Sequence, residues 1–396
     1  MLQEFFMTNS LFSSSDWSFP VPIAYGPGRI AEIAALCRQN GMQKPLVVTD
    51  RGSANLPFVS SLLDCLEGAG LGRALYSEIS PNPRDTEIAG GKAMFRSGGH
   101  DGIVAIGGGS GMDGGKAIAL TATNDLDLWA FEFEQPAPDM SAHPAFPPLI
   151  TIPTTAGTGA ETESTAMITD TQRWMKWCVW HAELKPALAL LDPEITIGLP
   201  PNLTAWTGAD ALVHAIEAYV VPGFHPLCDG AALEALRLIS RWLPDAVEDP
   251  ANLEARGGML VGSCLAGVAF LKGLGLVHAL SHMVGAEYDT HHGLTNAILL
   301  PSVLRFNAPS IEAQIAPMAQ AMGLPDTRFD TFDKAICTML DDLGIPETLA
   351  EIGVPPDCAD RVAAKAMEDS AAGTNPRPLS VSEVKAVLLD AIEVGR

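Results

Sequence analysis

Five polar residues in the middle of the chain have the types and spacing of a divalent-metal site. Asp210 and His214 are four residues apart in TGADALVHAIEAYV, and His278 and His282 are four apart in GLGLVHALSHMVGAEYDTHHG. On a helix this spacing places two side chains on one face, so each pair could hold a cation. His292 opens the next apolar segment. Three imidazoles and one carboxylate would suit Fe²⁺ or Zn²⁺.

The spacing leaves two choices open within this group. His278 and His282 are equally placed on their helix, and His291 directly precedes His292. A lone histidine on a helix more often belongs to a core or a surface. Five such residues in two clusters, in a chain with only 9 histidines, nevertheless favour a metal centre.

A glycine-rich turn earlier in the chain has the features of a phosphate-binding loop. The sequence GGGSGMD at 107–113 follows the apolar run GIVAI and leads into an apolar helix. Glycines let backbone amides approach a pyrophosphate, and the helix start adds partial positive charge. The turn is not the usual GxGxxG fingerprint, because Ser110 and Met112 occupy its fourth and sixth positions. It is consistent with a dinucleotide site, although an ordinary strand-to-helix turn has a similar composition.

A second turn, TIPTTAGTG at 151–159, also follows an apolar run. Its hydroxyls and amides could hold the ribose and phosphate of a cofactor, because loops at the carboxyl ends of parallel strands converge. Asp50 ends the run LVVTD, where a carboxylate commonly receives ribose hydroxyls and repels the additional phosphate of NADP. A helix cap or a solvated loop acid is the alternative for Asp50. The pattern favours NAD.

Composition excludes several classes of partner. The chain has 396 residues, 47% apolar and 18% charged, and a formal net charge of -23, which repels nucleic acid and anionic membranes. No apolar run approaches the length of a membrane span. The 7 cysteines are scattered and form no CxxC, as in a reducing compartment. We expect a cytoplasmic protein with no nucleic-acid or membrane partner.

The segments that would position these residues fall into two halves. Short apolar runs at 46–50, 102–109 and 148–155 read as buried parallel strands, and helical spacing lies between them at 30–40, 56–70 and 85–98. A hairpin flanks Thr171 and Gln172, and beyond Pro200 nearly every segment has helical periodicity. We therefore predict an α/β domain with a mostly parallel, Rossmann-like sheet at 1–194 and an all-helical domain at 195–396.

Together these motifs resemble the iron-containing (group III) alcohol dehydrogenases. The resemblance runs from about residue 17 to 396 and rests on GGGSGMDGGK, TIPTTAGTGAE, ALLDPEIT, DALVHAIEAY and GLVHALSHMVGAEYDTHHGLTNAILLP. It implies a dehydroquinate synthase-like architecture and a homodimer or larger homo-oligomer. It also implies hydride transfer between NAD(H) and a small alcohol or aldehyde, with Fe²⁺, or Zn²⁺ in its place, at the metal site.

The resemblance also assigns roles to individual residues. It makes metal ligands of Asp210, His214, His278 and His292, choosing His292 over His291 because the family pattern is His followed by Gly. It places His282 beside the substrate, where it can relay a proton. It assigns NAD binding to Asp50, Asn82, Gly108, Gly109, Ser110, Asp113, Thr154, Thr155, Thr158, Lys176 and Leu191.

Two departures and two alternatives accompany this hypothesis. Ala160 replaces the usual serine after TAGTG, and Lys272 stands shortly before the candidate ligand His278. Lys272 could favour substrates with an acidic tail, or it could be a solvated lysine at a helix end. A dehydroquinate-synthase-like lyase would use Glu as its first ligand and a more basic phosphate pocket. A metal-dependent hydrolase would not need the two glycine turns.

Overall fold

The computed structural model describes residues 15–17, 21–173 and 175–396. The chain divides by its internal contacts into two compact units. The first unit comprises Met1–Thr155, Ala160–Gly198 and Ala251–Leu260, and the second comprises Ala156–Gly159, Leu199–Pro250 and Val261–Arg396. Because each unit contains several segments, a single boundary after residue 194 stays a prediction.

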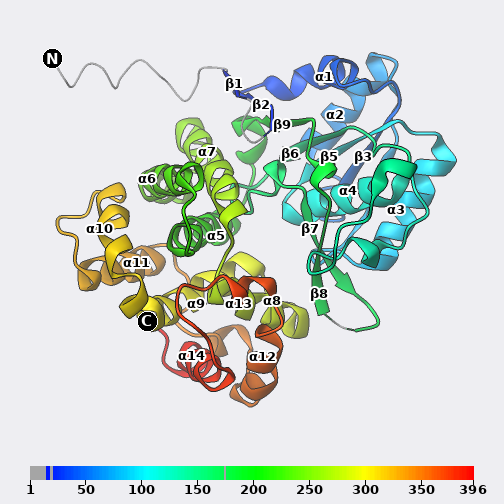
Figure 1. The fold of residues 1–396 in the computed structure, drawn as a ribbon. Helices are drawn as coiled ribbons and strands as arrows, with labels where there is room; N and C mark the ends of the chain where they lie inside the picture. The colour runs from blue at the N-terminus through cyan, green and yellow to red at the C-terminus, as the bar shows by residue number, and fades with distance from the viewer. Residues whose placement is uncertain (1–14, 18–20, 174) are drawn as a thin grey trace. The chain divides into compact units, whose positions relative to one another are not determined.

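The first unit contains a seven-stranded sheet in the order β1-β2-β9-β6-β5-β3-β4 (Figure 1). β1 is antiparallel to β2, and all other neighbouring strands in this sheet are parallel. The predicted mostly parallel sheet is confirmed. The strands are β1 (Ser15–Trp17), β2 (Ile23–Tyr25), β3 (Pro45–Asp50), β4 (Leu75–Ile79), β5 (Gly102–Gly107), β6 (Leu149–Pro153) and β9 (Leu188–Leu191), with a separate hairpin of β7 (Thr165–Asp170) and β8 (Met175–Trp180).

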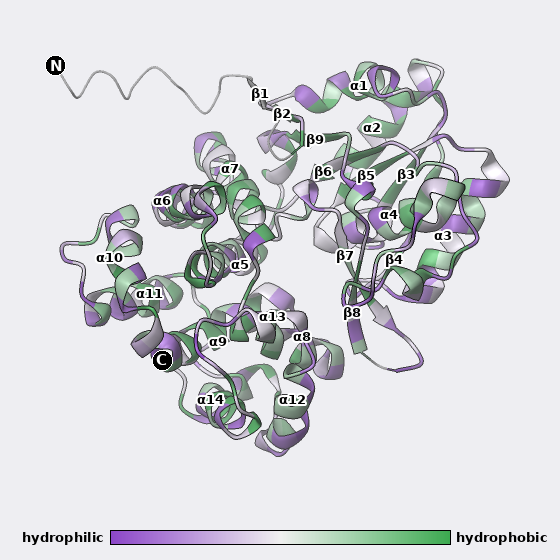
Figure 2. Cartoon of the chain, viewed as in Figure 1, coloured by the Kyte–Doolittle hydropathy of each residue, from purple (hydrophilic) through white to green (hydrophobic). Residues whose placement is uncertain are grey.

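Alternating apolar side chains bury both faces of this sheet. In β3, Leu46 and Val48 pack into one hydrophobic cluster and Val47 into another, as the two-residue period of a strand requires. Green, the hydrophobic end of the scale, accordingly predominates on the central strands in Figure 2. The first cluster includes residues of α3 (Asp85–Gly98) and α4 (Gly109–Ala122), and the second includes residues of α1 (Ile33–Gln39) and α2 (Pro57–Gly68).

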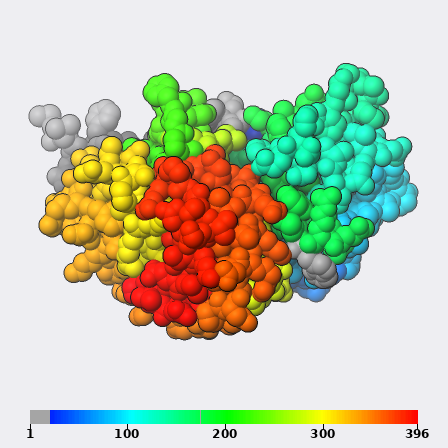
Figure 3. Space-filling model, turned by 60° about the horizontal axis from the view of Figure 1, so that its bottom comes forward, coloured from blue at the N-terminus to red at the C-terminus, as the bar shows by residue number. Residues whose placement is uncertain are grey.

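The second unit is built from helices, as predicted, and its C-terminal helices form part of the face shown in Figure 3. Its α5 packs against α6 and α9, and α8 packs against α9. The helices beyond the sheet are α5 (Pro201–Val220), α6 (Pro226–Glu248), α7 (Leu253–Ala269), α8 (Leu276–Tyr288), α9 (His292–Asn307), α10 (Glu312–Ala321), α11 (Phe329–Asp342), α12 (Ala359–Ala366), α13 (Ser370–Gly373) and α14 (Val381–Glu393).

Among the described residues, one helical stretch, Leu253–Lys272, is long and apolar enough to cross a membrane. Most of this stretch is buried inside the protein. Core helices of globular proteins share this length and composition, so the stretch is weak support for a membrane span.

Candidate active site

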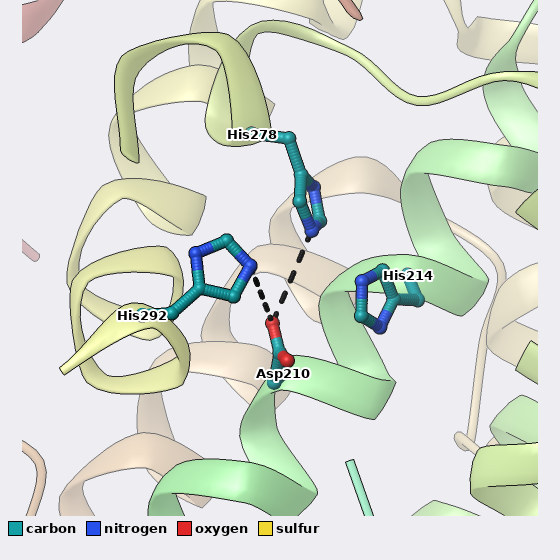
Figure 4. A group of neighbouring side chains, drawn as sticks. All are labelled: Asp210, His214, His278 and His292. Carbon is teal, nitrogen blue, oxygen red and sulfur yellow. Dashed lines mark ion pairs between the residues drawn. The ribbon is translucent and has the colours of Figure 1, made fainter. Parts of the chain in front are cut away.

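Three helices of the second unit bring four candidate metal ligands together (Figure 4). Asp210 and His214 lie one turn apart on α5, His278 lies on α8, and His292 is the first residue of α9. One ligand atom from each residue lies within 4.8 Å of all the others. Asp210 Oδ1 is 3.9 Å from His278 Nε2 and 3.8 Å from His292 Nε2. This separation leaves room for a cation at ordinary ligand distances.

The His214 imidazole is held in the tautomer that a metal ligand needs. Its Nδ1 lies 3.2 Å from the carbonyl oxygen of Gly157, which can only accept a hydrogen bond, so Nδ1 carries the proton. Burial lowers the pKa of His214 to about 4, outweighing the opposite effect of the Asp210 charge. His214 is therefore neutral near pH 7, with an unprotonated Nε2.

His278 is oriented by the buried carboxylate of Glu217. Glu217 Oε2 accepts a hydrogen bond from His278 Nδ1 at 2.6 Å, and its Oε1 accepts one from the backbone N–H of Val277 at 2.8 Å. Desolvation, the largest single effect, lowers the pKa of His278, but the Glu217 and Asp210 contacts together raise it. A carboxylate behind a ligand histidine fixes the ring and increases its basicity. Gly275 is needed here, because an added Cβ would lie 2.8 Å from Glu217 Oε1.

The start of α9 separates the roles of the two adjacent histidines. His291 caps the helix, since its Nδ1 accepts a hydrogen bond from the backbone N–H of Leu294. His292 instead directs Nε2 toward Asp210, with Nδ1 3.2 Å from Ser281 Oγ. Gly293 permits this approach, because an added Cβ would lie 2.4 Å from a backbone oxygen of α5. The geometry thus gives a physical reason for glycine after the ligand histidine.

His282 lies beside the four residues, with its ring stacked on that of His292 at 5.4 Å between centroids. Its Nδ1 is 2.8 Å from Asp369 Oδ2, and Asp369 Oδ1 accepts a hydrogen bond from the backbone N–H of Ala371. Asp369 is thereby fixed at the start of the short helix α13. The result is a carboxylate–imidazole pair whose Nε2 remains the available ring nitrogen, the arrangement of a proton relay.

The Lys272 side chain is largely enclosed and paired, so its interpretation as a solvated lysine at a helix end is wrong, whereas its effect on substrates with an acidic tail stays a prediction. Its side chain is 7% exposed, and Nζ lies 2.6 Å from Asp229 Oδ1. A second contact at 3.4 Å joins Nζ to the carbonyl oxygen of Tyr219. The charge is therefore paired inside the second unit rather than solvated.

In the first unit, the glycine turn meets the ends of three parallel strands. An added Cβ at Gly107 would lie 2.8 Å from Asp50 Oδ2, and one at Gly108 would lie 3.6 Å from Thr155 Oγ1. Thr154 N–H donates to the carbonyl oxygen of Gly107 at 2.9 Å. The buried Oγ1 of Thr155 has no hydrogen-bond partner among the described residues. A close backbone approach with an unsatisfied hydroxyl beside it fits a phosphate or ribose ligand.

Several of the remaining residues predicted to bind NAD contact other protein groups near α4. Lys176 Nζ donates to Asn82 Oδ1 at 3.4 Å, and Ser110 Oγ donates to the neighbouring Pro81 carbonyl at 2.5 Å, so these side chains gather near one end of α4. Asp113 uses both carboxylate oxygens within the protein, for Lys116 Nζ at 3.0 Å and the backbone N–H of Met167 at 3.1 Å.

The other three occupy different places. Gly109 begins α4, and Leu191 ends β9, where its carbonyl oxygen accepts from Gly26. Thr158 belongs to the second unit. The assignment of NAD binding to these residues stays a prediction.

Comparison with known proteins decides the family. A family model described as iron-containing alcohol dehydrogenase matches residues 20–193, and one for the C-terminal part of the Fe-containing alcohol dehydrogenase family matches 204–392. The chain belongs to the iron-containing alcohol dehydrogenase family. It is accordingly an oxidoreductase of the alcohol dehydrogenase and aldehyde reductase type.

Similar members of the iron-containing alcohol dehydrogenase family match nearly the whole chain. A 1,3-propanediol dehydrogenase from Klebsiella pneumoniae is 37% identical over 385 residues, covering 95% of this chain and 98% of the relative. An NAD-dependent methanol dehydrogenase from Bacillus methanolicus is 35% identical, with 96% and 100% coverage. The crystal structure of a 1,3-propanediol oxidoreductase superposes with a TM-score of 0.88 at 37% identity, covering 93% of this chain and 97% of that one.

Two residues at the site escape prediction from the sequence. Asp369 lies 87 residues from His282, so no periodicity connects them. Asn296 follows His292 by one helical turn and contacts three of the candidate ligands. That i, i+4 spacing is the one signal in the sequence that points to it.

Proposed function

We propose that this protein is a metal- and NAD-dependent alcohol dehydrogenase or aldehyde reductase that acts on small primary alcohols or their aldehydes. The observation that carries the proposal is the set of four ligand atoms within 4.8 Å of one another. In each histidine of this set, a neighbouring polar atom contacts Nδ1, so that Nε2 can serve the cation.

The donor set supports a borderline divalent cation. Three imidazoles and one carboxylate suit Fe²⁺ and Zn²⁺, and Zn²⁺ binds such sites more tightly when both ions are available. When bound, the cation supplies Lewis acidity that favours the deprotonated form of a substrate hydroxyl. We propose Asp210, His214, His278 and His292 as its ligands.

The chain's own contribution to proton transfer is the pair of His282 and Asp369. Asp369 keeps the proton of His282 on Nδ1, so Nε2 can take the hydroxyl proton during oxidation and return it during reduction. The carboxylate also stabilises the imidazolium that forms in between. His282 is 9% exposed, so its proton can still be passed on to solvent.

NAD(H) is the proposed cofactor. Asp50 is anchored by Ser53, whose backbone N–H and hydroxyl donate to the two carboxylate oxygens at 2.9 and 2.8 Å. A fixed carboxylate beside the glycine turn would disfavour the 2′-phosphate of NADP. The similar methanol dehydrogenase is named as NAD-dependent. A homodimer or larger homo-oligomer and a cytoplasmic location are part of the same proposal.

One assay tests the function. The absorbance of NADH is followed in the presence of a series of short aldehydes and alcohols. The measurement is made before and after chelation of the metal, and the metal content of the protein is determined in parallel. We expect turnover that chelation abolishes and Fe²⁺ or Zn²⁺ restores. No turnover of any aldehyde or alcohol by metal-loaded protein refutes the proposal, and metal-dependent hydrolysis without nucleotide would identify a hydrolase instead.

A further inference from the structure

Asn296 is fully buried at the ligand set, although it is not one of the four candidate ligands. Its Nδ2 lies 2.6 Å from Asp210 Oδ1, 3.1 Å from His278 Nε2 and 3.1 Å from His292 Nε2. One side-chain amide therefore contacts three of the four atoms that would bind the cation.

The contacts with the two imidazoles compete directly with a cation. A ring nitrogen without a proton has one lone pair in the ring plane, which can accept a hydrogen bond or bind a metal. His278 donates through Nδ1 to Glu217, so its Nε2 is the nitrogen with that lone pair. A hydrogen of Asn296 directed at this nitrogen occupies the place of a metal–nitrogen bond.

The contact with Asp210 has no such conflict. A carboxylate offers about four lone-pair sites, so one oxygen can bind a cation while a hydrogen bond to the carboxylate persists. At 2.6 Å this is a short, charge-assisted hydrogen bond to a side chain that is 2% exposed. A buried carboxylate needs such a donor whether or not a cation is present.

The carbonyl of the amide does not fix the orientation of Asn296. Its Oδ1 is buried and has no hydrogen-bond partner among the described residues. The orientation is therefore determined by the donor group and the ligand atoms that it faces. An amide held in this way can withdraw from the imidazoles without breaking another hydrogen bond.

We propose that Asn296 is an internal competitor of the metal ion. Its NH₂ has two hydrogens, so without a cation one is donated to Asp210 and the other is shared between the imidazoles of His278 and His292. When the cation binds, the amide gives up the contacts with the imidazoles and keeps the one with Asp210. This role rests on the proposed function, because it requires the four residues to bind the metal. The amide thereby stabilises the buried ligands before metal binding and weakens metal affinity.

The substitution Asn296→Leu tests this role, because leucine has the same branched arrangement of side-chain atoms and no donor. In the wild type, the contacts with the imidazoles exist only when no cation is bound. Their loss in the variant should therefore destabilise the metal-free protein more than the metal-loaded protein. We expect Zn²⁺ to bind about fivefold more tightly, as the loss of one neutral hydrogen bond would produce. Thermal unfolding should show a larger difference in Tm between Zn²⁺-loaded and chelated protein than in wild type.

The matched control is Asn307→Leu, on the same helix. Asn307 is also buried, and its Nδ2 donates to Asn375 Oδ1 at 3.0 Å. This substitution should lower the Tm of chelated and Zn²⁺-loaded protein equally and leave Zn²⁺ affinity unchanged. It separates the general cost of replacing a buried asparagine in α9 from the effect at the ligand set.

The measurement is competition for Zn²⁺ against a chromophoric chelator, with purified full-length protein. Unchanged or weaker binding by Asn296→Leu overturns the competitor role and leaves the proposed function intact. Failure of the wild type to bind Zn²⁺ stoichiometrically would refute the metal site and this role with it. If Asn296→Leu does not fold, crystal structures of the wild type with and without Zn²⁺ decide: an amide still 3.1 Å from both imidazole nitrogens in the loaded protein overturns the proposal.

Discussion

Replacing Glu217 by glutamine should impair metal binding through the tautomer of His278. Glu217 accepts two hydrogen bonds, from His278 Nδ1 and from the backbone of Val277. Glutamine has the same shape but only one accepting oxygen, so its NH₂ must face one of these two donors. If it faces His278, the imidazole relieves the conflict by moving its proton to Nε2, which removes the lone pair that the metal requires.

The size of the effect follows from these two contacts. Loss of a hydrogen-bonding partner behind a metal-bound histidine typically lowers metal affinity 10- to 100-fold, or about 1.4 to 2.8 kcal/mol. Both contacts of Glu217 are buried and one is only 2.6 Å long, so we expect a value near the upper end. The free energy of unfolding should also fall by about 1 to 3 kcal/mol, because the NH₂ group of the glutamine faces a buried N–H group that has lost its acceptor.

Equilibrium competition for Zn²⁺ against a chelator measures the affinity, and urea denaturation of chelated protein measures the stability. Glu163→Gln is the matched control, since Glu163 is a buried carboxyl in the first unit and its substitution should leave Zn²⁺ affinity unchanged. A change of less than threefold for Glu217→Gln, with the protein folded, would refute the tautomer argument.

Three further outcomes are expected. Asp369→Asn should lower kcat about 10- to 100-fold at unchanged metal content, because His282 loses its carboxylate partner; steady-state kinetics with metal analysis check this, and an unaltered kcat contradicts it. Burial raises the pKa of Glu163 from its ordinary 4.5 to about 7. As the pH rises between these two values, Glu163 loses its proton in the unfolded chain but keeps it in the folded protein. The free energy of unfolding should therefore fall by about 3 kcal/mol over this pH range. Glu163→Gln should remove that decline between pH 5 and 8 in urea denaturation, whereas parallel curves for both proteins would rule it out. Asp50→Ser should raise kcat/KM for NADP(H) relative to NAD(H) about tenfold by relieving charge repulsion; an unchanged ratio would show that Asp50 does not face the 2′-position.

The fold could be predicted from the sequence because the apolar runs of its strands and the helical spacing of its helices are both strong patterns. Buried strands such as β3 and β5 are continuous apolar runs that end at a turn, and both were predicted within about two residues. β4 was harder, because LYSEI mixes apolar and polar residues at the edge of the sheet. The environment of Lys272 was not accessible, since its partner Asp229 is 43 residues away and burial of a lysine depends on tertiary structure.

The candidate site was accessible only in part. The i, i+4 pairs Asp210/His214 and His278/His282 were visible, but spacing could not say which histidine faces the cation. The structure separates them by their partners: Nδ1 of His278 contacts Glu217, and Nδ1 of His282 contacts Asp369. Such partners come from distant segments, which a single sequence does not connect.

The distance along the chain between His282 and Asp369 also has a consequence for synthesis. A nascent chain emerges N-terminus first, and the four candidate ligands are complete once His292 has left the ribosome. Asp369 emerges 77 residues later than His292 by subtraction of their numbers. A chain interrupted between these points would carry every candidate ligand but would lack Asp369 and the helices α12, α13 and α14, which pack against α8 and α9. The surroundings of the candidate site are therefore completed later in synthesis than its ligands.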